Sequence, residues 1–456
     1  MEWDSKVEDL FQKLLDRLPE TLRPTVKPMC IEAAEKRAVE RQSALVSKDD
    51  FITGIFDIVP ESFKATVNKD LTELGVDVSK YVELKEIRDR MMMSWDSFAK
   101  GFQPGVMHFA MYLTDRCNMN CLHCASNRDP RPELSTDQWC KIIENLETGL
   151  RGIGRRGTYV WFGGEPTLRD DISDIMKYCG DRGYNHAIIT NGVKFDDDFA
   201  KMCKENKISH VFVSFDSADP EKNDKLRGYP NSLQYAEQAV KLCLKYGIFV
   251  CASITAMKQN IDELPEIKSL AEKWGAVAYF RPVLRQNRAA DYWDEIGLNQ
   301  EDYKNLYNFK YDRAMKSIRA GNACNLPVFE IYEMTPFMEF PRNEEEKAAI
   351  EWGVGCQACR AMMGIELDGT IYPCGYPTKT TLGNALVDDF YFVLNLQIYK
   401  DIRDRKRNGK CGECHHLKYC GGGCCVHTET ETGDILGSFP YCWHENDHVH
   451  TEEHVE

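Results

Sequence analysis

The sequence predicts an α/β protein built around a partial (β/α)6 barrel, with a helical domain before it and a small cysteine-rich domain after it. Three observations support this fold class. Helical patterns fill residues 1–100, and from about residue 105 to 285 short β-rich runs alternate with helical stretches. From Cys356 to Cys442, cysteines and glycines dominate. Alternating strands and helices form parallel sheets, and six units are too few for a closed eight-stranded barrel, so we expect an open, TIM-like partial barrel.

The predicted elements follow in order along the chain. In the helical domain, residues 1–100, Asp9–Leu15 carries apolar residues at helical spacing and Glu32–Ala38 is rich in helix formers. The barrel domain, residues 101–285, has candidate strands at Met107–Leu113, Thr158–Phe162, His186–Thr190, His210–Phe215, Phe249–Thr255 and Val277–Val283. Its candidate helices include Thr136–Leu150, Tyr235–Tyr246 and Ile261–Trp274. We expect a helical bridge over residues 286–350, with Tyr303–Arg319 its clearest helix, the cysteine-rich domain over 351–445 and an acidic tail over 446–456.

Composition excludes several function classes. With 57 Lys and Arg against 72 Asp and Glu, the net charge is −15, which repels phosphate backbones and anionic lipid, so we expect no nucleic-acid or membrane binding. Residues 1–5 lack the basic and apolar regions of an export signal, so a cytoplasmic location is expected. In that reducing compartment, nineteen cysteines favour metal or redox chemistry over disulfides.

The first cysteine group follows the first predicted strand as C-x3-C-x2-C, formed by Cys117, Cys121 and Cys124. Thiolates bind both iron–sulfur clusters and zinc. A closed zinc site needs a fourth ligand, and His123 is poorly placed for it because it adjoins Cys124. Three ligands on a four-iron cluster would leave one iron open for catalysis. The spacing therefore favours an open cluster, with a structural zinc loop as the alternative.

Further motifs follow at the ends of the next strands. Gly163–Pro166 reads GGEP, Thr190–Gly192 ends the third strand, Val213–Asp216 ends the fourth, and Asp224 and Arg227–Gly228 come after it. With the cysteine loop, this series over residues 105–285 resembles the radical S-adenosylmethionine (SAM) enzymes.

The resemblance implies a chemistry and a role for each motif. The open iron would chelate the amino and carboxylate groups of SAM, and an electron from the cluster would break a carbon–sulfur bond to give a 5′-deoxyadenosyl radical that abstracts hydrogen. Gly163 and Gly164 would let backbone approach the ligand. The implied SAM contacts are Gly163, Gly164, Glu165, Asn191, Ser214 and Asp216, the last two at the ribose, and Arg227 at the methionine carboxylate. The alternatives are a surface salt bridge for Arg227, a strand-end hydrogen bond for Ser214 and turn chemistry for Asn191.

The second cysteine group resembles the SPASM extension of radical SAM enzymes, which carries two auxiliary four-iron clusters. Cys359, Gly369 and Cys374 are followed by C-x2-C-x5-C-x3-C and by a final cysteine. The resemblance assigns Cys356, Cys359, Cys374 and Cys424 to auxiliary cluster one, and Cys411, Cys414, Cys420 and Cys442 to auxiliary cluster two. The cofactors expected are thus three [4Fe–4S] clusters and SAM, with zinc ribbons as the alternative for this segment. We expect the clusters to hold together a segment with little core of its own, and Cys425 to be either a core residue or an alternative ligand.

The expected function is a radical SAM enzyme that abstracts hydrogen from a peptide or protein, because SPASM-bearing enzymes mostly modify peptides. A low-potential electron donor, ferredoxin or flavodoxin, would serve it. Gly375 stands where sulfatase-maturing relatives carry a general-base aspartate, so that chemistry is not expected. Residues 27–65 resemble a helical domain of a light-independent protochlorophyllide reductase subunit, which favours as an alternative a tetrapyrrole or other small cofactor precursor as substrate. A non-catalytic iron–sulfur electron carrier is the alternative from another class. No catalytic acid or base is assigned.

Overall fold

The structure is a computed structural model of the 456-residue chain, and it describes residues 1–18, 23–41, 43–59, 67, 70–78, 106–126, 131–319, 356–414 and 417–443. The predicted bridge beyond Arg319 and the predicted acidic tail lie outside these residues. The described residues up to Val78 belong to one compact unit, and those from Val106 to Lys316 and from Cys356 onward belong to a second. The two units are described separately.

The first unit is helical, as predicted. It contains α1 (Ser5–Asp16), α2 (Arg23–Glu40) and α3 (Lys48–Ile58), with a short parallel pair of strands, β1 (Glu2–Trp3) and β2 (Leu45–Val46). Its core includes Phe11 and Phe51, whose ring centroids lie 5.0 Å apart. The α3 helix begins at a capping box, in which Ser47 and Asp50 exchange side-chain and backbone hydrogen bonds.

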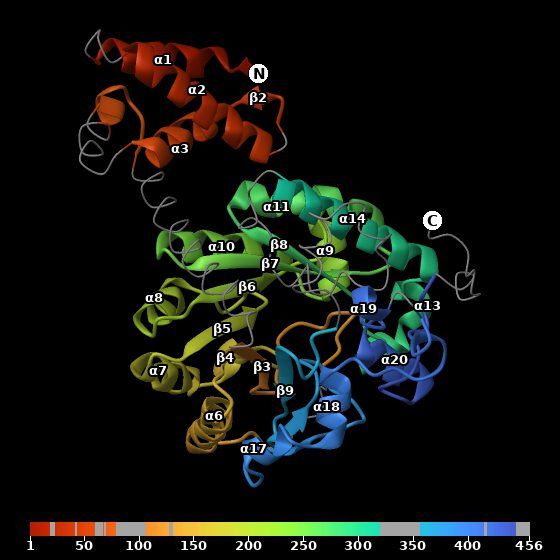
Figure 1. Cartoon of the computed structure of the whole chain (residues 1–456). Coiled ribbons are helices and arrows are strands. Elements are labelled where there is room, and N and C mark those ends of the chain that lie inside the picture. Colours follow the sequence, from red (N-terminus) through yellow and green to blue (C-terminus); the bar gives the residue numbers. More distant parts are fainter. Residues whose placement is uncertain are drawn as a thin grey trace. The chain divides into compact units, whose positions relative to one another are not determined.

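The second unit contains the predicted barrel, and the fold class is confirmed. Six parallel strands pair in chain order: β3 (Val106–Tyr112), β4 (Arg156–Phe162), β5 (Asn185–Thr190), β6 (His210–Ser214), β7 (Phe249–Ala256) and β8 (Val277–Pro282). Helices alternate with them: α6 (Thr136–Arg151), α7 (Ile172–Arg182), α8 (Asp197–Glu205), α9 (Pro220–Arg227), α10 (Ser232–Lys245) and α11 (Leu264–Trp274) (Figure 1). Then come α12 (Arg288–Asp291), α13 (Trp293–Ile296) and α14 (Gln300–Arg319). Every predicted strand agrees with the structure to within two residues at each end.

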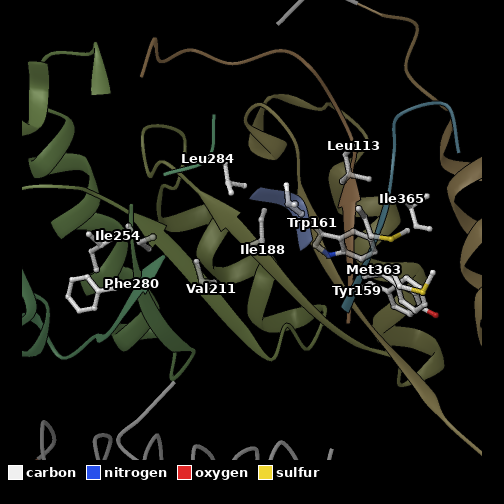
Figure 2. Packing of buried hydrophobic residues seen from close by; sticks show 14 of the residues in the cluster. Leu113, Tyr159, Trp161, Ile188, Val211, Ile254, Phe280, Leu284, Met363 and Ile365 are labelled. Atoms are coloured by element: carbon white, nitrogen blue, oxygen red, sulfur yellow. The ribbon is translucent and has the colours of Figure 1, made fainter. Parts of the chain in front are cut away.

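The barrel core forms because side chains alternate between the two faces of each strand. Along β4, Tyr159 and Trp161 belong to the apolar layer between sheet and helices, whereas Val160 belongs to a smaller cluster with Phe212 and Tyr279. Figure 2 shows the large layer, which contains residues from β4 through β8 and from the cysteine-rich domain. No helix among the described residues is both long and apolar enough to cross a bilayer.

The cysteine-rich domain extends the barrel sheet. The strand β9 (Met362–Ile365) pairs in parallel with β3, from His108 opposite Met362 to Met111 opposite Ile365. Antiparallel β10 (Thr370–Tyr372) and β11 (Gly383–Asn384) follow, so the complete sheet has nine strands in the order β11-β10-β9-β3-β4-β5-β6-β7-β8. The helices of the domain are α17 (Phe390–Val393), α18 (Gln397–Arg403), α19 (Leu417–Cys420) and α20 (Cys425–Thr432).

This domain has little core of its own, as expected, but it shares the core of the barrel. Met363, Ile365, Phe390 and other apolar side chains of the domain are buried in the same hydrophobic cluster as the barrel. Phe390 packs edge-on against Phe109 of β3, with ring centroids 5.6 Å apart. The sequence pattern hides this core because its apolar residues are scattered over short elements that are completed by the barrel.

Candidate functional site

A cavity opens at the carboxyl ends of the barrel strands, where ligands bind in parallel α/β folds. Phe162, Ile189, Ser214, Thr255 and Arg281 are the last inward-facing residues of β4 to β8, and all five line it. The cavity measures about 760 Å³, including a part open to solvent.

All three cysteines of the loop Cys117–Cys124, called here the cluster loop, line this cavity. The pKa of the Cys121 thiol is raised to about 11, mainly by burial. The charge of Arg227 opposes this rise, and the charges of Cys124 and Cys117 add to it. The three sulfurs and Arg227 are therefore electrostatic neighbours. A thiol buried in this way becomes a stable thiolate when a metal replaces its proton, so the donor set fits an iron–sulfur cluster.

One side of the cluster loop is held by the GGEP segment. The N–H groups of Gly164 and Glu165 donate to the carbonyl oxygens of Thr114 and Arg116, over 2.6 and 2.8 Å. A Cβ at Gly164 would lie 2.2 Å from the Arg116 oxygen, and one at Gly163, where φ is +134°, would lie 2.4 Å from the Thr114 oxygen. The glycines thus allow two chain segments to meet. Both also line the cavity, and their predicted role, close approach of the backbone to the ligand, stays a prediction.

The other side of the cluster loop rests on the end of α9. The N–H groups of Asn120 and Leu122 donate to the carbonyl oxygens of Arg227 and Leu226, over 3.2 and 3.0 Å. Gly228 has φ of +60°, and a Cβ there would lie 2.4 Å from the Asn120 oxygen. Two motifs that are far apart in the sequence therefore hold one loop between them.

Glu165 is a structural anchor on the cavity wall. One of its carboxylate oxygens accepts hydrogen bonds from the hydroxyl groups of Thr167 and Thr190, over 2.7 and 2.8 Å. The other accepts from the backbone N–H of Asn191, over 2.7 Å. Burial raises the pKa of Glu165, and these hydrogen bonds oppose the rise. The carboxylate therefore ties the end of β4 to the end of β5.

Asp216 does not line the cavity, in contrast to the predicted ribose contact. It is fully buried, and one carboxylate oxygen accepts from the backbone N–H of Thr255 over 2.8 Å. The other accepts from Arg227 over 3.0 Å and lies 3.4 Å from Nε2 of His123. Burial acts to raise the pKa of Asp216, but His123 and Arg227 outweigh it and hold that pKa below its usual value. Asp216 is therefore an ionised group that positions Arg227.

The remaining predicted SAM contacts lie on the cavity wall. Arg227 lines it and keeps a buried Nε–H with no hydrogen-bond partner in the described part of the chain, as a site for an anionic ligand would. Ser214 lines it at the end of β6. Asn191 lines it too, and its side-chain amide donates to Asn118 of the cluster loop over 2.7 Å.

The eight cysteines of the second group fall into two neighbourhoods. Burial raises the pKa of the Cys359 and Cys424 thiols, and the charges of Cys356 and Cys374 raise the pKa of these two thiols further. The side chain of Cys425 hydrogen-bonds to Cys356, and burial opposes the resulting fall in the pKa of Cys356 to about 6. Cys425 thus lies among the cysteines of the first neighbourhood.

The second neighbourhood surrounds Cys420. Burial raises the pKa of its thiol to about 12, an N–H from Gly422 lowers it, and the charges of Cys411, Cys442 and Cys414 raise it. That N–H lies 3.2 Å from the Cys420 sulfur. These electrostatic neighbourhoods agree with the two predicted sets, and the assignment of each set to one cluster stays a prediction. In the described residues no group of three or more ligand side chains, the cluster loop included, converges on the position of a single metal ion.

Among the side chains on the cavity wall that the sequence analysis did not predict are Arg281 and Tyr376. Arg281 ends the inward face of β8, and Tyr376 follows Cys374 by two residues. An N–H of Arg281 donates to the Tyr376 hydroxyl, and the guanidinium carbon lies 5.4 Å from the ring centroid. Val277, Tyr279 and Arg281 occupy alternate positions of β8, and this pattern could have predicted that Arg281 faces the inside of the barrel. Nothing in the sequence indicates that Tyr376 reaches the barrel.

Comparisons with known proteins match two regions of the chain. Residues 111–271 match the radical SAM superfamily, and residues 356–415 match an iron–sulfur cluster-binding domain, SPASM. The chain belongs to the radical SAM superfamily, and it is an enzyme of the type that carries a SPASM domain.

Two kinds of relatives stand out. The chain is 28% identical over 349 residues to an AdoMet-dependent heme synthase of Methanosarcina barkeri, covering 73% of this chain and 95% of that protein. It is also 28% identical over 321 residues to the mycofactocin maturase MftC of Mycolicibacterium smegmatis, covering 68% and 76%.

Among solved structures, the fold resembles anSMEcpe with bound AdoMet, with a TM-score of 0.57 and 18% identity over 74% of this chain and 90% of that one. It also resembles Streptococcus suis SuiB bound to the precursor peptide SuiA, with a TM-score of 0.54 and 20% identity over 74% and 76%.

Proposed function

We propose that this protein cleaves SAM reductively and uses the resulting 5′-deoxyadenosyl radical to abstract a hydrogen atom from a peptide or protein. The observation that carries the proposal is the meeting of the three cluster-loop cysteines and Arg227 on the wall of one cavity at the carboxyl ends of the barrel strands. A cluster bound there supplies the electron that breaks the carbon–sulfur bond of SAM.

The residues of the chain bind and orient the cofactor. Cys117, Cys121 and Cys124 hold the cluster, with the backbone hydrogen bonds on both sides of the loop fixing their positions. Arg227 binds the methionine carboxylate, because its planar fork matches a carboxylate and Asp216 fixes its orientation. Ser214, on the cavity wall at the end of β6, contacts the ribose.

Two auxiliary [4Fe–4S] clusters complete the set of three. Cys356, Cys359, Cys374 and Cys424 hold the first, and Cys411, Cys414, Cys420 and Cys442 hold the second. Clusters held by four cysteines each would supply electron transfer, with a low-potential ferredoxin or flavodoxin as the donor. The described cysteines are free thiols, which suits a reducing cytoplasm.

The first experiment measures 5′-deoxyadenosine. Anaerobically reconstituted protein, reduced with dithionite or flavodoxin and given SAM, should release 5′-deoxyadenosine, detected by liquid chromatography and mass spectrometry. The variant with all three cluster-loop cysteines changed to Ala is the control and should release none. No release from the wild-type protein would instead favour a non-catalytic electron carrier.

A second candidate substrate is a tetrapyrrole precursor. It is favoured by the match to 95% of the length of an AdoMet-dependent heme synthase, against 76% for the mycofactocin maturase. Incubation with iron coproporphyrin III and, separately, with a mycofactocin precursor peptide distinguishes the two. A mass change in only one of them, together with an increase in 5′-deoxyadenosine, identifies the substrate class.

A further inference from the structure

A buried arginine lies next to cysteines of both auxiliary sets. Arg407 precedes Cys411, the first ligand assigned to auxiliary cluster two, and only 7% of its surface is exposed. A guanidinium is always charged in proteins, so a full positive charge is buried at this point. A buried charge is stable only where a partner compensates it. The contacts of Arg407 indicate which group can do so.

The hydrogen bonds of Arg407 go to uncharged backbone groups. Its Nη1 donates to the carbonyl oxygen of Lys406 over 3.0 Å, and its Nε donates to that of Gly422 over 3.4 Å. Its Nη2 is buried and has no hydrogen-bond partner in the part of the chain that the structure describes. None of these contacts is with a carboxylate, so one donor and the positive charge remain to be matched.

Two glycines hold Arg407 between the auxiliary sets. Gly422 lies in the turn between Cys420, of the second set, and Cys424, of the first. It has φ of +77°, and a Cβ there would lie 2.6 Å from both Cγ and Nε of Arg407. A Cβ at Gly412 would lie 2.3 Å from the carbonyl oxygen of Arg407. The side chain of Arg407 is therefore packed closely against the turn that connects the two sets.

The charge of Arg407 reaches the first set. The pKa of the Cys356 thiol is lowered to about 6, mainly by a side-chain hydrogen bond with Cys425. Burial opposes this fall, and the positive charge of Arg407 adds to it. Because a Coulomb interaction weakens with distance, the guanidinium lies near Cys356. A negative group held by Cys356 would lie within reach of the same charge.

We propose that Arg407 is the buried counter-charge of auxiliary cluster one and raises the reduction potential of that cluster. The proposal rests on the proposed function, which assigns a [4Fe–4S] cluster to Cys356 and its three partner cysteines. Reduction moves one electron from the low-potential donor to the cluster and forms or breaks no bond, so the cluster with its thiolates gains one negative charge. A buried cation stabilises this more negative state, since net charge and hydrogen bonds to the sulfurs set the potentials of such clusters.

The test measures the midpoint potentials of the clusters in anaerobically reconstituted holoenzyme, by redox titration followed with electron paramagnetic resonance. Arg407→Met removes the charge, whereas Arg407→Lys keeps it, and both remove the guanidinium. In Arg407→Met, the ratio of reduced to oxidised auxiliary cluster one at a fixed potential should fall at least about tenfold, or about 59 mV for one electron. In Arg407→Lys, this ratio should change less than about threefold, because the buried charge remains.

Further variants locate the shift. When all three cluster-loop cysteines are changed to Ala, the shift should persist, because it belongs to an auxiliary cluster. Cys420→Ser changes a ligand of auxiliary cluster two and so marks the signal that should not move. Arg403→Gln is the matched control: Arg403 lowers the pKa of Cys359, which burial raises, but it pairs with Asp404 over 2.8 Å and is partly exposed. Its loss should change the ratio less than about threefold.

Four results would overturn the proposal: an unchanged potential in Arg407→Met, an equal shift in Arg407→Lys, a shift of the signal marked by Cys420→Ser, or loss of auxiliary iron from both Arg407→Met and Arg407→Gln. The last result would make Arg407 a structural residue. Release of 5′-deoxyadenosine and iron content are measured on the same samples. If the wild-type protein releases 5′-deoxyadenosine and holds about twelve irons while no potential moves, this inference fails and the proposed function does not. A wild-type protein without auxiliary iron would overturn both the inference and the proposed set of three clusters.

Discussion

Replacement of Gly164 by Ala tests whether the GGEP segment positions the cluster loop. The added Cβ would lie 2.2 Å from the carbonyl oxygen of Arg116, so the two segments must separate. Separation breaks the hydrogen bonds of 2.6 and 2.8 Å donated by Gly164 and Glu165. Each is worth about 1 kcal/mol, and overpacking adds about 1–3 kcal/mol. The total cost is therefore about 3–5 kcal/mol, concentrated at the loop that carries the three cysteines.

The assay is the iron content of anaerobically reconstituted protein together with its release of 5′-deoxyadenosine. Three four-iron clusters give about twelve irons, so loss of the cavity cluster should leave about eight and no SAM cleavage. Gly183→Ala is the matched control, because a Cβ there has no atom within 4 Å although φ is +68°. It should cost only about 1–2 kcal/mol of backbone strain and keep all the iron. Full iron and normal SAM cleavage in Gly164→Ala would refute the reasoning.

Three further predictions concern the cluster ligands, Arg227 and the first unit. Changing all three cysteines of the loop Cys117–Cys124 to Ala should abolish SAM cleavage and leave about eight irons, measured by iron and sulfide analysis; retained cleavage would contradict the ligand assignment. Arg227→Ala should weaken SAM binding in equilibrium dialysis far more than it lowers the iron content; unchanged affinity would remove Arg227 from the cofactor site. Burial acts to raise the pKa of Asp50, but hydrogen bonds from Arg41 and Ser47 hold that pKa below its usual value. The stabilisation is therefore complete at neutral pH and is lost as pH falls through the folded pKa. Asp50→Asn should speed hydrogen exchange in α3 at pH 7, and its difference from the wild type should shrink below about pH 4; a difference that is constant with pH would argue against the ion pair.

The parts of the fold that depend on local pattern could be predicted from the sequence. Strand positions followed from short β-rich runs, and the helix predicted over Thr136–Leu150 agrees with α6 to within one residue. The start of α10 was predicted three residues late, at Tyr235 rather than Ser232. The reason is that Asp224, in the preceding helix, accepts the N–H groups of Asn231 and Ser232 over 2.7 and 2.8 Å. Such a cap comes from outside the helix, and no local rule detects it.

The residues of the candidate site also fall into those that a local pattern predicts and those that depend on tertiary packing. Motif spacing was enough to bring the cluster-loop cysteines and Arg227 to one cavity, because each motif ends a neighbouring strand or begins the helix after it. For Asp216 the sequence predicts a ribose contact, because nothing in the sequence indicates that buried groups donate hydrogen bonds to both of its carboxylate oxygens. Arg281 and Tyr376 meet across 95 positions of sequence, and this contact depends on tertiary packing alone.

The pairing of β9 with β3 has a consequence for the evolution and engineering of this chain. An open barrel exposes the backbone of its first strand, and an exposed strand edge invites aggregation. Here that edge is occupied by a strand encoded some 250 residues later. A truncated chain ending before residue 356 would lose this pairing together with the auxiliary cysteines, so we expect a barrel expressed alone to aggregate more readily than the whole chain.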